Sequence, residues 1–331
     1  MRHLAVSKGE YIRTSQLRSK TLQAARDWFK DHSFMEIQVP HITGATGSCE
    51  WFPNAMPVDM YDDKGADAKM FLRQTGQLYL EAFTVAHNRV YTIGPSFRQE
   101  RKVTDRHLCE FTLIEFEARD FELAGLMDHI ESLIKKMYSA SLSLFDNELL
   151  KSYVNQPFNR ISYKAAVALL NENGHELEHG DDLGAAEEQD LCKILNNLPT
   201  FVTLYPSDPR PKEGGVIKFF SMKRDNGTTL CCDLLLPNAG ESVGGAVREG
   251  SSSICKKQFE ESYMYDHIVD SGVDPAQFNW YFEILDEAEG QSSGCGIGFE
   301  RVIQSIQATE QEHVSIKAAV ELPRSPEYLV P

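Results

Sequence analysis

Two neighbouring stretches decide the fold: residues 94–100 read GPSFRQE, and residues 104–111 read TDRHLCEF. The first carries an arginine and a glutamate ahead of a turn, and the second carries an Arg-His pair followed by a phenylalanine. A guanidinium binds phosphate oxygens through paired N–H donors, and an aromatic ring offers a face on which a flat base stacks. The two stretches therefore predict a hairpin that clamps a triphosphate and stacks a base.

A third stretch, residues 294–301, reads GCGIGFER and lies far along the chain from the hairpin. Its glycines allow the backbone to approach a ligand closely. Gly298 stands where a strand gives way to a helix with Arg301 at its start, and the N-terminus of a helix favours anions. Together with the hairpin, this stretch predicts that ATP binds on an antiparallel sheet.

These segments resemble motifs 2 and 3 of the class II aminoacyl-tRNA synthetases, and in detail the asparaginyl/aspartyl branch. The resemblance extends to residues 34–40 (FMEIQVP, like motif 1), 75–81 (TGQLYLE) and 233–249 (DLLLPNAGESVGGAVRE). The patterns follow the family's order from about Phe34 to Arg324. The chain looks closest to archaeal asparagine synthetases related to asparaginyl-tRNA synthetase. The resemblance implies an α+β fold, a class II synthetase-type antiparallel β-sheet flanked by helices.

We expect one catalytic domain over residues 1–331, with a small helical insertion at about 150–200. The motif 1-like stretch comes so early that we expect no N-terminal OB-fold, the anticodon-binding domain of this branch. Strand-rich segments without regular βαβ alternation predict the same α+β class. Within this layout we expect strands at 216–222 and 279–286, and one helix at roughly 254–271.

The composition of the chain limits the classes of partner that it is expected to bind. The chain has 42% hydrophobic and 25% charged residues and a net charge of −16, and this balance argues against an extensive tRNA footprint. The acidic runs at 175–182 and 187–190 are interpreted as a solvated insertion. Seven cysteines without CxxC spacing predict reduced thiols in a cytoplasm. We expect no membrane association, because no apolar run is long enough to span a bilayer.

Arg98 is the strongest catalytic candidate. A guanidinium can bring a carboxylate and the α-phosphate together and stabilise the pentacoordinate phosphorus of the transition state. A surface salt bridge to Glu100 is the structural alternative. The resemblance implies that Arg301 is a second catalytic residue and that both motifs build the ATP site. Its implied members are Glu100 on the adenine amino group, Arg106 and His107 on the outer phosphates, Phe111 and Arg301 on the two faces of adenine, and Leu108, Glu241 and Gly298.

Glu241 and Asp233 are the candidate metal ligands, and we expect both at the end of one apolar strand. Hard carboxylate oxygens suit the Mg²⁺ that ATP phosphates share. Glu241 is the better candidate, because the matching family position coordinates metal. The alternative for Asp233 is a strand-end acid that faces water.

Substrate choice rests on four further side chains. Arg248 reads a planar carboxylate or amide through its forked donors. The resemblance implies that Glu50 and Gln77 hold the α-ammonium group. Aspartyl enzymes have a lysine where this chain has Leu80, whereas asparaginyl enzymes use a glutamate like Glu81. A carboxylate there accepts bonds from an amide NH₂ and repels a second carboxylate, which favours asparagine.

Aspartate could also bind in the reverse orientation, with its two carboxylates exchanged. Arg248 would then take its α-carboxylate and Glu81 its α-ammonium, while the β-carboxylate would meet Arg98, the residue shared by nucleotide and substrate. Attack by ammonia on the adenylated β-carboxylate would give asparagine. Trp51-Phe52-Pro53 after Glu50, where the family usually continues with Gly-Ala, keeps an unusual substrate open.

The leading hypothesis is an AMP-forming ligase that makes a carbon–nitrogen bond through an aminoacyl adenylate. ATP with Mg²⁺ activates aspartate or a close analogue, ammonia or an amine accepts it, and AMP and pyrophosphate leave. We expect a homodimer, because motif 1 is the family's dimer interface, and we expect no tRNA partner. The alternatives are a truncated asparaginyl-tRNA synthetase-like enzyme that charges tRNA, a biosynthetic paralogue for an unusual amino acid, and a catalytically silent amino-acid-binding regulator.

Overall fold

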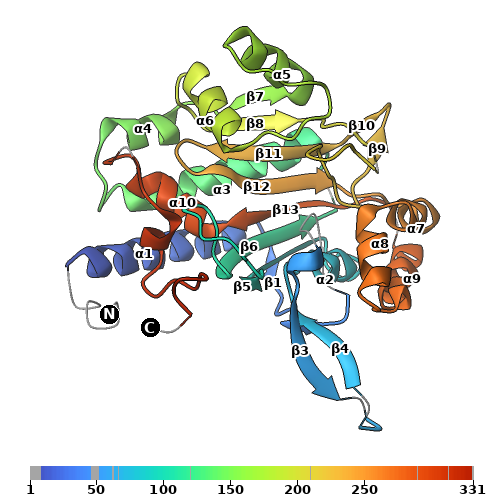
Figure 1. The fold of residues 1–331 in the computed structure, drawn as a ribbon. Helices are drawn as coiled ribbons and strands as arrows, with labels where there is room; N and C mark the ends of the chain where they lie inside the picture. Colours follow the sequence, from blue (N-terminus) through green and yellow to red (C-terminus); the bar gives the residue numbers. More distant parts are fainter. Residues whose placement is uncertain are drawn as a thin grey trace.

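A computed structural model describes residues 9–45, 52–61, 63–65, 67–119, 121–208, 210–288, 290–311 and 313–329. Its centre is an eight-stranded sheet with the order β1-β5-β6-β13-β12-β11-β8-β7 (Figure 1). The six inner strands pair antiparallel, and the two edge strands, β1 and β7, pair parallel with their neighbours. In that order the strands span Met35–Glu36, Arg89–Phe97, Glu110–Ala118, Ser293–Gly298, Gly240–Val247, Cys231–Leu236, Thr200–Thr203 and Asn159–Ser162.

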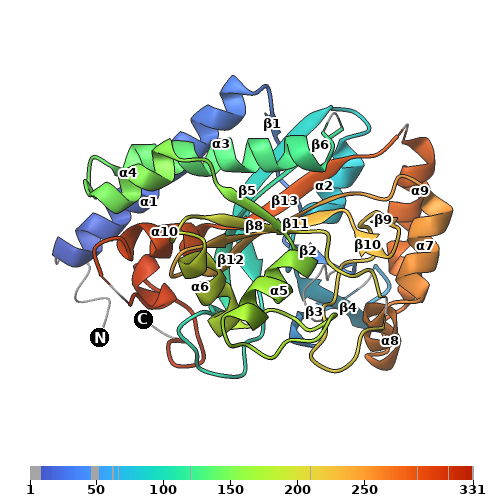
Figure 2. The same cartoon turned by 90° about the horizontal axis from the view of Figure 1, so that it is seen from above.

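Helices cover both faces of the sheet, so the α+β expectation is confirmed. Figure 2 shows α1 (Gly9–Asp31), α3 (Leu123–Ser141) and α4 (Glu148–Asn155) along one side, and α5 (Tyr163–Glu172) and α6 (Ala185–Ile194) on the other. Helix α3 lies on the sheet because six of its apolar side chains recur at helical spacing and are buried. These are Leu126, Met127, Ile130, Leu133, Ile134 and Met137.

Smaller elements surround the sheet. Helix α2 (Gln77–Phe83) and helix α10 (Phe299–Gln307) follow two of the quoted motifs. A three-stranded sheet of β2 (Ile42–Thr43), β4 (Asp67–Leu72) and β3 (Met56–Tyr61) carries the hairpin that projects in Figure 1. Short pieces complete the described chain, namely η2 (Phe52–Asn54), β9 (Arg224–Asp225), β10 (Thr228–Thr229) and η4 (Ile316–Ala319). In the described part of the chain, no helix combines the length and apolarity needed to cross a membrane.

The strand expected at 279–286 is wrong, because these residues form helix α9 (Asn279–Glu287). A short 3₁₀ turn, η3 (Pro275–Phe278), leads into it, and the Asp274 side chain accepts a hydrogen bond from the backbone N–H of Ala276. An aspartate followed by proline is a helix start signal. Aromatic and β-branched residues gave the segment its strand-like composition, but their burial follows helical spacing.

Two other expectations also need correction. Residues 216–222 form no strand, because their backbone groups bond to separate segments, as Val216 does to Gly180. The single helix expected at 254–271 is two helices, α7 (Ser252–Glu260) and α8 (Tyr263–Asp270). The break occurs because the Ser262 hydroxyl accepts from the N–H of Tyr265 and caps a new helix.

The segment at about 150–200 contributes more than helices. Helices α5 and α6 lie within it, but its strands β7 and β8 extend the central sheet beyond β11. Helix α6 also packs against β11 and β12. The segment thereby forms one wall beside the middle of the sheet.

Gly294 on β13 is a position where the fold depends on a missing side chain. A Cβ placed there would lie 2.1 Å from the Phe116 carbonyl oxygen and 2.1 Å from a Glu117 carboxylate oxygen. We predict that Gly294→Ala lowers the free energy of unfolding by at least about 1–3 kcal/mol, the usual cost of overpacking. Urea denaturation monitored by circular dichroism measures this change.

The matched control is Gly125→Ala in α3, where the nearest atom to a new Cβ is 3.8 Å away. Alanine is the better helix former, so this variant should gain up to about 1 kcal/mol. Equal stabilities for the two variants would contradict the close approach of β13 to β6.

Candidate active site

One cavity of about 550 Å³ lies over β6, β11, β12 and β13, and charged side chains line it. Most of the predicted site residues meet there, although they come from five separate stretches of sequence. They are Gln77, Arg98, Glu100, Arg106, His107, Leu108, Phe111, Asp233, Glu241, Arg248, Gly298 and Arg301. Glu81 adjoins the cavity through its hydrogen bond from Gln77, and Glu50 falls outside the described residues.

Arg98 follows directly after strand β5, and its backbone N–H donates to the carbonyl of Cys109 at 2.9 Å. Its Nη1 lies 3.6 Å from Oε1 of Glu100, and its guanidinium carbon lies 6.0 Å from the centre of the Phe111 ring on β6. Burial lowers the pKa of Arg98, against the effects of Glu100 and Glu241. The salt bridge to Glu100 therefore exists, but it lies in the cavity wall rather than on an outer surface.

Three further cationic or basic side chains gather beside Arg98. Arg301 Nη1 donates to the carbonyls of Ala239 and Glu241 at 3.0 and 2.7 Å, and its Nη2 donates to the carbonyl of Arg106 at 3.3 Å. Burial lowers the pKa of Arg301, and Arg106 lowers it further. The His107 ring contacts the Thr104 hydroxyl through Nδ1 at 2.9 Å. This end of the cavity is suited to a polyanion.

Glu188 on α6 also reaches this end of the cavity. It pairs with Arg106 Nη2, and only 6% of the residue is exposed. The interpretation of residues 187–190 as a solvated acidic run is therefore wrong at Glu188, which is buried in the cavity wall. Sequence reasoning missed it, because its partner Arg106 is 82 residues away and no local pattern marks the pairing.

Asp233 and Glu241 face the same part of the cavity, although not from one strand. Asp233 is on β11 and Glu241 is on β12, in a hairpin. A Cβ at Gly244 would lie 3.6 Å from a Glu241 oxygen and 3.9 Å from an Asp233 oxygen, so both carboxylates border one small volume. Lys218 Nζ bonds Asp233 Oδ2 at 2.6 Å.

The surroundings of Glu241 suit a bound cation. Enclosure by protein raises the pKa of this carboxyl, and Asp233 raises it further, although the side chain stays open to the water of the cavity. A divalent ion would remove that cost, and two carboxylates beside a polyanion site are the ligands that Mg²⁺ takes. In the described part of the chain, no group of three or more His, Cys, Asp or Glu side chains could hold a metal by itself.

The other end of the cavity is built around Glu81 on α2, which is 4% exposed. Its Oε1 accepts from Gln77 Nε2 at 2.6 Å and from the Ser221 hydroxyl at 3.2 Å. Its Oε2 accepts from the Tyr281 hydroxyl at 2.5 Å. These donors keep the carboxylate in one orientation, so it is a rigid acceptor at the end of the cavity.

Arg248 lies beside Glu81 and is held by Glu117 on β6. Its Nε and Nη2 donate to the two Glu117 oxygens at 2.9 and 3.1 Å, and its Nε lies 3.5 Å from Glu81 Oε1. Burial alone would lower the pKa of Arg248, but Glu117 and then Glu81 raise it above its ordinary value. Ser292 donates a further bond to Glu117 at 3.2 Å. One buried guanidinium therefore serves two carboxylates.

Several residues of this end were not predicted. Glu115 and Glu117 had a signal, since two glutamates alternate in an otherwise apolar strand and so share one face. Glu115 accepts from the N–H of Gly76 at 2.9 and 3.0 Å. Tyr281 was hidden by the strand prediction for 279–286, which obscured its place on a helix.

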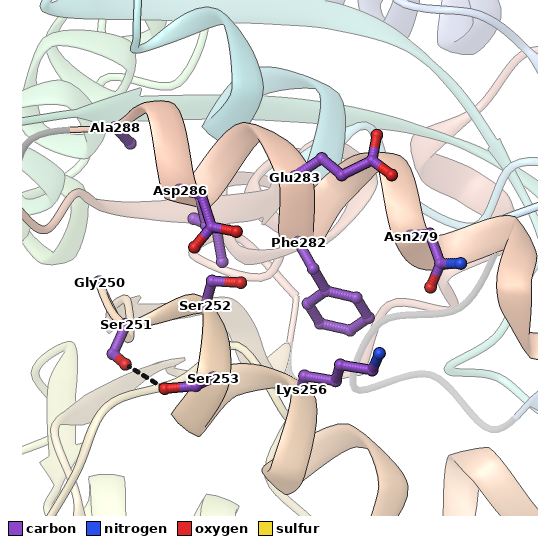
Figure 3. Close-up of a pocket in the computed structure, with 11 residues that line it drawn as sticks. Gly250, Ser251, Ser252, Ser253, Lys256, Asn279, Phe282, Glu283, Asp286 and Ala288 are labelled. Atoms are coloured by element: carbon purple, nitrogen blue, oxygen red, sulfur yellow. Dashed lines mark hydrogen bonds between the residues drawn. The ribbon is translucent and has the colours of Figure 1, made fainter.

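A second cavity, of about 670 Å³, lies between α7 and α9. Figure 3 shows Ser252 and Lys256 on one side of it and Glu283 and Asp286 on the other. None of the predicted site residues lines it. The cavity over the central sheet is therefore the candidate active site, because the predicted site residues converge there and not around the second cavity.

The sequence matches the family described as "tRNA synthetases class II (D, K and N)" over residues 1–325. The asparagine–tRNA ligase of Lactococcus lactis subsp. lactis is 31% identical, over 98% of this chain and 70% of the relative. The probable mitochondrial asparagine–tRNA ligase of Dictyostelium discoideum is 28% identical, over 95% of this chain and 69% of the relative.

Solved structures give the same result. The asparaginyl-tRNA synthetase from Pyrococcus horikoshii, complexed with asparaginyl-adenylate, aligns with a TM-score of 0.84 at 30% identity. The alignment covers all of this chain and 72% of that protein. The aspartyl-tRNA synthetase from Entamoeba histolytica aligns with a TM-score of 0.74 at 23% identity, which bears on the fold alone.

His107 makes the free energy of unfolding depend on pH. Burial, followed by Arg301, Arg98 and Arg106, lowers the pKa of this imidazole from 6.5 to about 4. As pH falls below 6.5 the unfolded chain takes up the proton first, so the free energy of unfolding decreases until about pH 4. The full shift corresponds to roughly 3 kcal/mol, and solvent screening at this partly exposed ring reduces it to about 1–2 kcal/mol.

We predict that His107→Gln removes this loss. Urea titrations at pH 7 and pH 4.5 measure it as a change in the stability difference between the variant and the parent protein. His313→Gln, at an exposed position, controls for the loss of one imidazole. A stability difference that is the same at both pH values would show that neither burial nor the surrounding arginines depress the His107 pKa.

Proposed function

The chain belongs to the class II tRNA synthetases of the D, K and N group, and from that membership we propose that it activates asparagine with ATP and transfers it to tRNA. The intermediate is an asparaginyl adenylate, and the products are AMP, pyrophosphate and the charged tRNA. The observation that carries the proposal is a single cavity with Arg98, Arg106 and Arg301 at one end and Arg248, next to Glu81, at the other.

The nucleotide occupies the cationic end. Arg106 and His107 take the outer phosphates, Phe111 stacks on adenine, and Arg301 closes the other face. Glu100 accepts from the adenine amino group, while Leu108 and Gly298 complete the surface. The support is geometric: these residues line one continuous cavity, and three arginines converge at this end of it.

The amino acid occupies the other end. Glu81 and Glu117 together carry two negative charges against the single charge of Arg248, so a third carboxylate, that of aspartate, meets net repulsion. The asparagine side chain is neutral. Its NH₂ donates to Glu81 and its oxygen accepts from Arg248 Nη1, because Nε and Nη2 are engaged by Glu117. Gln77 and Glu50 hold the α-ammonium group.

In the first step an α-carboxylate oxygen attacks the α-phosphorus, and the bond from that phosphorus to pyrophosphate breaks. Arg98 contacts both anions, aligns them and stabilises the negative charge on the five-coordinate phosphorus. In the second step a ribose hydroxyl at the tRNA 3′ end attacks the carbonyl, and AMP leaves. Arg98 then stabilises the phosphate of the departing AMP.

Glu241 and Asp233 would hold Mg²⁺. When bound, the ion shields the phosphate charges and stabilises the developing charge on pyrophosphate. Lys218 already neutralises part of Asp233, so Glu241 is the stronger ligand of the two. The chain's own contribution is to fix the two carboxylates on adjacent strands.

The relatives support tRNA as acceptor, which the sequence analysis kept as an alternative, over the leading hypothesis of ammonia or an amine. The expectation that tRNA is no partner finds no support among them. Their names include both bacterial ligases and a mitochondrial one, so the location of this chain stays a prediction, as does the homodimer.

The test is asparagine-dependent ATP–pyrophosphate exchange by the purified chain with Mg²⁺, followed by acylation of bulk tRNA. We expect exchange with asparagine and at least about a hundredfold less with aspartate. Arg98→Ala should reduce exchange by about 10²–10³-fold or more, because it removes transition-state contacts, while the fold persists. Circular dichroism checks the fold of the variant.

Other results would redirect the assignment. Asparagine made from aspartate only with ammonium, seen by mass spectrometry, would replace tRNA charging with asparagine synthesis. Exchange with neither acid would point to another carboxylate or to a silent paralogue. Full exchange by Arg98→Ala would remove this residue from the chemistry.

A second prediction concerns amide recognition. Glu81→Gln removes the charge that rejects aspartate and replaces one acceptor oxygen by a donor, so it should narrow the asparagine preference over aspartate at least about tenfold. Comparison of kcat/KM for the two acids measures this. Glu283→Gln makes the same chemical change on the exposed face of α9 and should leave the ratio unchanged. An unaltered ratio in Glu81→Gln would place amide recognition elsewhere.

A further inference from the structure

The contact between Arg106 and Glu188 joins two parts of the molecule that the proposed mechanism treats separately. Arg106 belongs to the loop between β5 and β6, which carries the phosphate-binding residues. Glu188 belongs to α6, in the segment whose strands β7 and β8 extend the central sheet. Their side chains are 27% and 8% exposed, so this is a partly desolvated ion pair inside the cavity.

One carboxylate oxygen of Glu188 accepts two hydrogen bonds. Oε2 accepts from Arg106 Nη2 and from the backbone N–H of Glu241, the latter at 3.2 Å. A guanidinium N–H and a strand-end N–H that converge on one anionic oxygen are the donors that a phosphate oxygen would use. Glu188 thus presents its carboxylate where a ligand phosphate would bind.

The adjoining turn is shaped around this pair. Gly240 has φ +71°, and a Cβ there would lie 2.3 Å from Glu188 Oε2 and 2.4 Å from Arg106 Nη2. Arg301 bonds the carbonyls on either side of this glycine, Ala239 and Glu241. The turn, both arginines and the carboxylate therefore form one packed unit.

We propose that Glu188 is a placeholder for an outer phosphate of ATP: it holds Arg106 in the nucleotide-free protein, yields it when the triphosphate binds, and recaptures it as pyrophosphate leaves. The inference rests on the proposed function, since it assumes that Arg106 meets the outer phosphates. It adds a residue that promotes the release of pyrophosphate without touching the reacting atoms.

Charge explains why Arg106 pairs with Glu188 in the nucleotide-free protein and with phosphate when ATP is bound. Without nucleotide, Glu188 offsets part of the repulsion among Arg98, Arg106 and Arg301. That repulsion acts on Arg301, because burial lowers its pKa and Arg106 and then Arg98 lower it further. With nucleotide, the phosphates supply that charge, and a carboxylate at the same donors would repel them. Glu188 therefore competes with ATP and with pyrophosphate, but not with AMP, which lacks outer phosphates.

The alternative is that Glu188 only positions Arg106. The two roles predict opposite changes in ATP affinity when Glu188 is neutralised. A positioning residue improves phosphate binding, so its neutralisation weakens ATP. A placeholder opposes phosphate binding, so its neutralisation strengthens ATP and slows the release of pyrophosphate.

Titration calorimetry with ATP, pyrophosphate and AMP distinguishes them in the full chain. For Glu188→Gln, which still accepts from the Glu241 N–H, we expect Kd for ATP and pyrophosphate to fall on the order of tenfold and Kd for AMP to stay the same. Glu187→Gln is the matched control on the same helix, because Glu187 pairs with His175 instead. Stopped-flow release of pyrophosphate should slow in Glu188→Gln alone.

Glu188→Asp provides a second variant should the glutamine protein fold poorly, as its shorter side chain keeps the charge but loses reach to Arg106. It should bind ATP more tightly than the parent by a smaller factor. Weaker or unchanged ATP binding in the folded Glu188 variants overturns the inference while AMP binding persists. Failure of the unaltered protein to bind either nucleotide overturns the proposed function and the inference together.

Discussion

The two-point ion pair between Arg248 and Glu117 is the contact on which the middle of the molecule depends. Both side chains are buried, at 3% and 1% exposure, so neither could stay charged there without the other. The pair is possible because β13 passes β6 at Gly294, where any side chain would collide with the Glu117 carboxylate. Strand pairing, a glycine and a buried charge pair therefore depend on one another, and the end of the cavity next to Glu81 is arranged around them.

The same principle extends across the cavity. Arg98 has Glu100, Arg106 has Glu188, Asp233 has Lys218, and Arg248 has Glu117 and Glu81. The protein thus carries internal counter-ions at the positions where charged ligands are proposed to bind. Such pairs contribute little net stability, because desolvation offsets attraction. Their effect is to keep the cavity open and ordered before any ligand arrives.

The sequence predicts much of this arrangement, and the failures have identifiable causes. Arg98 and Phe111 could be placed because they lie close together in the sequence and also in the site. Arg301 could be placed because the glycine-rich stretch just before it marks the start of a helix. Glu188 could not, since it reaches the site through α6 from a stretch that reads as surface. Tyr281 was missed because aromatic residues favour strands in isolation, whereas the Asp274-Pro275 start and helical burial decide otherwise. Local patterns identified the motifs, but the long-range pairing of charges required the fold.

Five glycines of β12 and β13 differ in the space available for a side chain. This difference determines how the size of the cavity can change. Gly294 and Gly245 are closely surrounded, because a Cβ at these positions would lie 2.1 and 3.1 Å from the nearest atom. Gly244, Gly296 and Gly298 line the cavity, and a Cβ at each would have its nearest neighbour at 3.6, 3.9 and 3.6 Å. A methyl group at these three sites would thicken the cavity floor without disturbing the sheet. The dimensions of the binding site can therefore drift during evolution, or be set by an engineer, almost independently of the stability of the scaffold beneath it.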